Sequence, residues 1–124
     1  MRRLLVVATV ALLATSAAAH ENAKGPNGGP VIDSAGHHLE LVTSGTELTI
    51  FLSEQDNSPI QSAGSKNARA VVQDGGKTVT VPLQPAAPNK LVGALPGPLG
   101  KGARVVVSAT MPDGHAVQGR FVNN

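Results

Sequence analysis

The sequence has 124 residues, with 10 Lys or Arg, 8 Asp or Glu, four His and no Cys, so disulfides, thiolate metal sites and cysteine catalysis are excluded. The formal net charge of +2 includes Arg2 and Arg3, and removal of a leader that carries them leaves eight basic and eight acidic residues. Because the chain is then neutral and lacks Trp and Tyr, the stacking groups of single-strand binders, we expect no nucleic-acid partner.

The first 19 residues have the layout of a secretory signal peptide. Two arginines precede the apolar run "LLVVATVALLA" (4–14), and small residues follow it as far as Ala19. A run of 11 residues lies in the range of ~7 to 15 that is typical of a signal core, and it is shorter than the ~20 needed to cross a bilayer. We therefore predict that residues 1–19 are cleaved, that no segment spans the membrane, and that the mature protein is periplasmic or secreted.

Beyond this leader the chain alternates between short apolar stretches and turn-forming residues. Residues 20–30 are rich in Gly, Pro and Asn and are expected to be flexible, and residues 31–124 are expected to form one domain. Period-two alternation of apolar and polar residues predicts strands at 37–43, 46–53, 68–73, 77–84, 89–95, 103–110 and 115–122.

This spacing favours an all-β domain, an antiparallel β-sandwich of immunoglobulin-like type with about seven strands. A small open β-barrel is the alternative. No "GxSxG" turn is present, and short loops between strands leave little room for a substrate cleft, so we do not expect an enzyme.

Three of the four histidines stand at the ends of predicted strands. His37 and His38 open the first predicted strand, and His115 opens the last one after the turn "PDG". Neutral imidazole is a common ligand of copper, zinc and nickel. Alternation places His37 and His115 on the core side of their strands, and places His38 on the other face beside Glu40, which would orient it. The alternative is that these are polar strand ends bonded to loops, because the sequence does not show that the strands of His37 and His115 are close.

Met111 lies four residues before His115, across the turn "MPDG". Its thioether is a candidate soft ligand for Cu(I), and the alternative is an ordinary apolar residue at the end of a strand. We expect Asp113 to stabilise the turn itself.

The fourth histidine, His20, lies at the expected signal-peptide cleavage site. Cleavage after Ala19 makes His20 the first residue, so that its amine and ring nitrogen chelate copper together. Cleavage after Ala17 makes it the third residue, which gives a square-planar nitrogen set suited to Cu(II) or Ni(II). Cleavage after Ala18 removes both arrangements, and a solvated tail without function is the alternative.

The stretch "GPNGGPVIDSAGHHLELV" (25–42) resembles the glycine-rich motif and following strands of periplasmic heavy-metal efflux adaptor (membrane-fusion) subunits and of small secreted proteins related to them. In that family "HGPHGG" or a near variant precedes a glycine, a hydrophobic residue and "LEL", and its members are associated with resistance to copper, zinc, nickel or cobalt. The resemblance covers about residues 25–52. Asn27 and Lys24 stand where the family often has histidine, so the resemblance does not imply a metal site inside the glycine segment.

Together these features predict a periplasmic protein that binds, buffers or delivers a transition metal. Copper is the expected ion, with nickel or zinc as alternatives, and a heavy-metal efflux adaptor or another envelope protein is the expected partner. The alternative is a metal-free module that docks to an envelope protein through a sheet edge or its Gly/Pro loops. The candidate metal ligands are His20, His37, His38, His115 and Met111.

Overall fold

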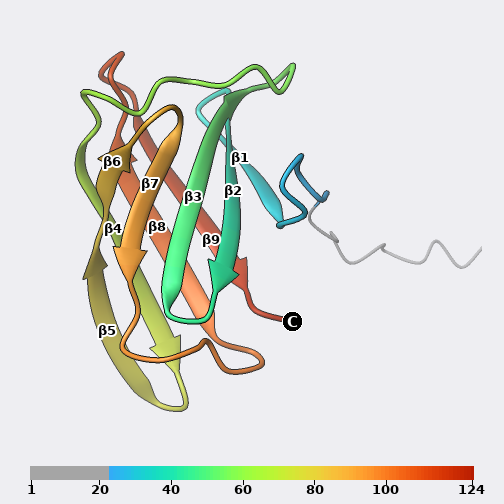
Figure 1. Ribbon diagram of the computed structural model, residues 1–124, viewed down its shortest axis with the longest axis vertical. Coiled ribbons are helices and arrows are strands. Elements are labelled where there is room, and N and C mark those ends of the chain that lie inside the picture. The colour runs from blue at the N-terminus through green and yellow to red at the C-terminus, as the bar shows by residue number, and fades with distance from the viewer. Residues whose placement is uncertain (1–22) are drawn as a thin grey trace, which may run out of the picture.

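The computed structural model describes residues 23–124, which form two antiparallel sheets packed face to face (Figure 1). The five-stranded sheet has the order β1-β2-β3-β7-β6, and the four-stranded sheet has the order β5-β4-β8-β9. The strands are β1 (Val31–Ser34), β2 (His37–Ser44), β3 (Glu47–Glu54), β4 (Lys66–Asp74), β5 (Lys77–Pro82), β6 (Gln84–Ala86), β7 (Lys90–Ala94), β8 (Arg104–Thr110) and β9 (Ala116–Val122). The predicted all-β antiparallel sandwich is confirmed, and the hydrogen bonding divides into two sheets rather than one barrel.

The seven predicted strands correspond to β2, β3, β4, β5, β7, β8 and β9, with ends that agree within two residues. The prediction missed β1 and β6, which have four and three residues and form the two edges of the five-stranded sheet. It also extended the strand of β5 to Gln84, the first residue of β6, although the chain passes from one sheet to the other at Leu83. Strands this short carry too few alternating residues to be recognised from their pattern.

Alternate residues of the longer strands point between the sheets and form one aliphatic core. Leu39, Ile50 and Val105 are among its fully buried members, and Phe121 is its aromatic residue. Each such side chain contributes about 1.5–3 kcal/mol on full burial. The same alternation directs His37 inward at the start of β2 and places its neighbour His38 on the outer face.

Residues 23–30 fold against the outer face of β2. Glu40, in β2, is only 2% exposed, and its carboxylate accepts hydrogen bonds from Asn27 N (2.9 Å), Asn27 Nδ2 (3.1 Å) and Gly29 N (2.9 Å). A side chain at Gly25 would overlap the Glu40 carboxylate, and one at Gly29 would overlap the carbonyl of Leu41. This part of the segment expected to be flexible is therefore a hydrogen-bonded loop, and Glu40 binds it instead of orienting His38.

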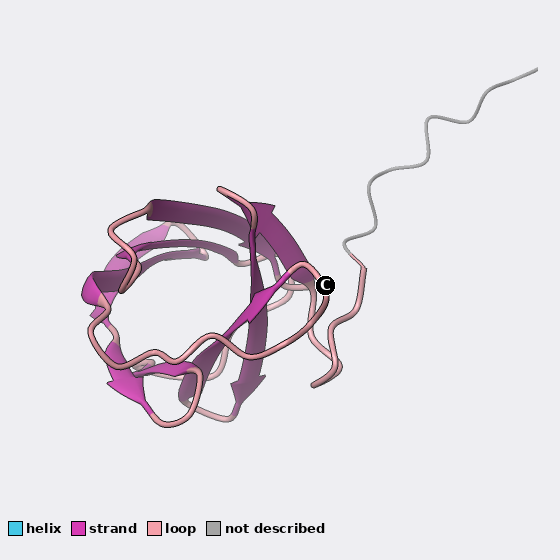
Figure 2. Cartoon of the chain, turned by 90° about the horizontal axis from the view of Figure 1, so that it is seen from above, coloured by secondary structure: helices cyan, strands magenta, loops and turns pink. Residues whose placement is uncertain are grey.

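The two sheets approach each other at the β1 and β9 edges, where Gln118 N donates to Ser34 Oγ (3.0 Å). Viewed from above, the strands curve around the core, and the edges of the two layers come close together (Figure 2). This approach brings the β1–β2 turn near the β8–β9 turn. Within residues 23–124 no helix has the length and apolar character needed to cross a membrane.

Candidate metal centre

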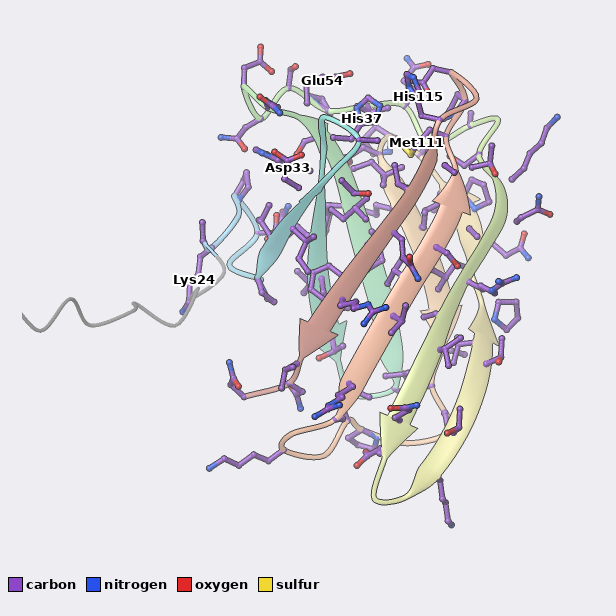
Figure 3. All side chains as sticks on the ribbon, turned by 180° about the vertical axis from the view of Figure 1, so that it is seen from behind. Lys24, Asp33, His37, Glu54, Met111 and His115 are labelled. Atoms are coloured by element: carbon purple, nitrogen blue, oxygen red, sulfur yellow. The ribbon has the colours of Figure 1, made fainter. Side chains whose placement is uncertain are left out.

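The start of β2 and the turn between β8 and β9 meet at one rim of the sandwich (Figure 3). The turn is closed by two hydrogen bonds, from Met111 N to His115 O (2.8 Å) and from Gly114 N to Met111 O (2.8 Å). Gly114 has a φ of 89°, which favours glycine over residues with a side chain. This tight turn holds Asp113 and His115 on the same side as His37.

Asp113 is the centre of the cluster. Its Oδ1 accepts a hydrogen bond from His115 N (2.9 Å), and its Oδ2 lies 2.8 Å from His115 Nδ1 and 3.1 Å from His37 Nε2. The backbone hydrogen bond from His115, followed by the bond from its ring, lowers the pKa of Asp113 to about 2. Asp113 is therefore a carboxylate near neutral pH, and since a carboxylate only accepts, the ring nitrogens that face it are the donors.

His37 occupies the buried side of this cluster. Its side chain is 11% exposed, and its ring centroid lies 5.8 Å from that of His115, which is 64% exposed. Its Nδ1 lies 3.4 Å from Glu54 Oε2 but has no hydrogen-bond partner. Glu54 is close because the β2–β3 register places it opposite His37. The Nδ1 atom of the buried His37 thus faces the Glu54 carboxylate without forming a hydrogen bond to it.

His37, Asp113 and His115 together offer one ligand atom each within 4.8 Å of the others. Two atoms that bind the same ion at ~2.1 Å are at most about 4.2 Å apart, so an ion requires only small movements of these side chains. Asp113 is 45% exposed and His115 more so, and such side chains can adjust. Two imidazole nitrogens and one carboxylate oxygen suit Cu(II), Ni(II) or Zn(II).

The structure brings together two of the five predicted ligands, His37 and His115. His38 points to the outer face of β2, and although its Nδ1 is buried without a hydrogen-bond partner, it is not part of the cluster. Met111 lies at the same rim (Figure 3), but it is 2% exposed and belongs to the hydrophobic core. His20 and the predicted leader, residues 1–19, lie outside the described residues.

The sequence did not predict that Asp113 lies at the centre of the cluster, between the rings of His37 and His115. The expected turn interaction exists, since Asp113 Oδ1 accepts a hydrogen bond from His115 N. The second carboxylate oxygen also joins the imidazole of this turn to that of His37 in β2 of the other sheet. The spacing of Asp113 and His115, two residues apart in a tight turn, is the signal that indicates their contact. The contact with His37, 76 residues away, depends on the fold.

No family model matches the chain, and no curated protein is similar to it in sequence. The resemblance of residues 25–52 to efflux adaptor subunits stays a prediction. Among solved structures, the archaellum periplasmic stator protein FlaG from Sulfolobus acidocaldarius is similar, with 17% sequence identity and a TM-score of 0.39. The match covers 73% of this chain and 95% of FlaG. A likeness of this degree carries no inference about function.

Proposed function

We propose that the protein binds one transition-metal ion at the rim of the sandwich, through His37, Asp113 and His115. The observation that supports this most is the convergence of two imidazoles on a single carboxylate oxygen, one from β2 of the five-stranded sheet and one from the β8–β9 turn of the four-stranded sheet. Copper is the first candidate because nitrogen-rich sites bind Cu(II) most tightly among the divalent ions, and nickel and zinc are the alternatives.

The exposure of the cluster favours a role in buffering or delivery. Three protein ligands leave at least one coordination position of the ion free for water or for a ligand of an acceptor protein. Asp113 and His115 are both open to solvent, whereas His37 is buried and would anchor the ion. We propose that the ion exchanges with a periplasmic partner, such as an efflux adaptor, without catalytic turnover.

The predicted chelating N-terminus at His20 is a second proposed site, and the two sites can be separated experimentally. The processed full-length protein is titrated with Cu(II), Ni(II) and Zn(II), beside the variants His115→Ala, His38→Ala and His20→Ala. We expect the equivalent bound at the rim to give a nitrogen-rich spectrum, to be lost in His115→Ala and to be retained in His38→Ala and His20→Ala. An equivalent bound at the N-terminus would be lost in His20→Ala alone.

Other outcomes would overturn the rim site. If His20→Ala abolishes binding and His115→Ala does not, the metal is bound by the N-terminus. If the protein binds no ion more tightly than a short peptide does, Asp113 is a metal-free clamp between the two sheets. The second result would favour the interaction module over metal binding.

A further inference from the structure

Charged side chains are segregated between the two sheets. The strands of the five-stranded sheet hold four acidic residues, Asp33, Glu40, Glu47 and Glu54, and one basic residue, Lys90. The strands of the four-stranded sheet hold one acidic residue, Asp74, and five basic residues, Lys66, Arg69, Lys77, Arg104 and Arg120. Residues 23–124 carry eight Lys or Arg and seven Asp or Glu, so this sheet is basic although that part of the chain is nearly neutral.

All three arginines of residues 23–124 lie on the outer face of the four-stranded sheet. Arg69 is opposite Ser108, and Arg120 is opposite Val106, in register with the neighbouring strand β8. Arg104 is two positions along β8 from Val106, so it is a diagonal neighbour of Arg120, at a typical Cα separation of ~7–8 Å. Figure 3 shows this sheet from the outside. We call the outer surface of β4, β5, β8 and β9 the basic face.

The charges of the basic face are not neutralised within the protein. Arg69, Arg104 and Arg120 are exposed, and within residues 23–124 none of them makes an ion pair or a side-chain hydrogen bond. The single acidic residue of these strands, Asp74, is partly buried and accepts a hydrogen bond from Gly100 N (2.8 Å). The guanidinium groups are therefore free to bind an external anion.

The basic face is also hollowed at the end far from the histidines. A shallow groove of about 360 Å³ is lined by the side chains of Gln73, Lys77, Thr78 and Arg104 and by glycines of the adjoining turns. Gln73 lies between Thr78 and Arg104 in the register of the sheet, so amide, hydroxyl and guanidinium groups stand in one row. This row offers hydrogen-bond donors beside positive charge, as recognition of a carboxylate requires.

We propose that the basic face binds an acidic segment of a partner protein, independently of the metal centre. Arginine pairs with carboxylates through two parallel hydrogen bonds and is enriched at protein interfaces. The face has no aromatic side chain on which a nucleic-acid base could stack, because the chain has no Trp or Tyr, Phe121 is buried and Phe51 lies in β3 of the other sheet. The exposed large apolar residues of its strands are Val79 and Val122, which are too small to anchor the protein in a lipid surface.

The test measures binding of a fluorescent oligoglutamate peptide, at low and high salt, to the processed protein without its predicted leader. We compare the double variant Arg104→Gln/Arg120→Gln with the control Lys24→Gln/Lys90→Gln, which removes the same charge from residues outside the basic face. We expect the peptide to bind at low salt, to dissociate as salt rises, and to bind about tenfold more weakly to the arginine variant than to the control.

Four results would overturn this proposal. They are absence of peptide binding at low salt, equal weakening in both variants, tighter binding to vesicles of anionic phospholipid than to the peptide, and self-association of the protein at low salt that the arginine variant abolishes. Circular dichroism of both variants checks that the fold is intact, and a loss of metal binding in the arginine variant would contradict the independence of the two sites.

Discussion

Two carboxylates, Glu40 and Asp113, each accept hydrogen bonds from both backbone and side-chain groups, yet their surroundings differ. Glu40 is 2% exposed and binds the amides of Asn27 and Gly29. Asp113 is 45% exposed and binds two imidazoles. The amides of Asn27 and Gly29 act here as hydrogen-bond donors, whereas an imidazole nitrogen can exchange its proton for a metal ion. Glu40 therefore fixes a loop, whereas Asp113 holds together the two imidazoles of the proposed metal site.

The largest expected effect is the loss of the Glu40 carboxylate. Glu40→Ala leaves the donors of Asn27 and Gly29 without a partner and should lower the free energy of unfolding by about 3 kcal/mol. Urea denaturation followed by circular dichroism measures this change. Metal affinity at the rim should stay at the wild-type value, and a loss of metal binding would mean that the two regions are not separate.

A smaller loss is expected when the close approach of the loop to β2 is blocked. A methyl group at Gly29 would overlap the backbone carbonyl of Leu41, so Gly29→Ala should destabilise the protein by about 2 kcal/mol. Gly97→Ala is the matched control because nothing lies near a side chain at that position. Equal stability of the two variants in urea would show that the loop is not packed on β2 as described.

The sequence predicted the strands that contribute most of the core, because alternation is clear wherever one face of a strand is buried. It also placed His37 on the inner face and His38 on the outer one. It did not predict that Glu40 is buried, because that burial depends on a loop folding over the outer face of the sheet. Nor could it join His37 to Asp113, since their contact requires the approach of two sheets that local patterns do not encode.

At the rim, changing the charge of Asp113 should affect metal binding more than folding. Asp113→Asn keeps the size of the side chain but removes an anionic ligand, so we expect metal affinity to fall about tenfold, or about 1.4 kcal/mol. Isothermal titration with Cu(II) gives this value. Glu40→Gln, the equivalent change at the carboxylate of β2 that holds the loop, should leave the affinity unchanged. Equal losses in both variants would remove the distinction between the two carboxylates.

The smallest effect concerns the acid stability of the metal-free protein. The pKa of Asp113 is about 2 in the folded state, below its ordinary value of 3.8, so its ionised form stabilises the fold above about pH 4. This contribution is lost as the pH falls from about 4 to about 2. Asp113→Asn should lose less stability over this interval than the wild type, as measured by urea unfolding with a chelator present. Parallel pH profiles of the two proteins would contradict the hydrogen bonding described for Asp113.

The proposed metal ion at the rim of the sandwich can be observed directly in crystals of the processed protein that are soaked with Cu(II) and measured at the copper absorption edge. We expect one anomalous peak within about 2.2 Å of a nitrogen of His37 and a nitrogen of His115, with an Asp113 oxygen beside it. A peak only at the N-terminus, or none at the rim, would contradict this proposal.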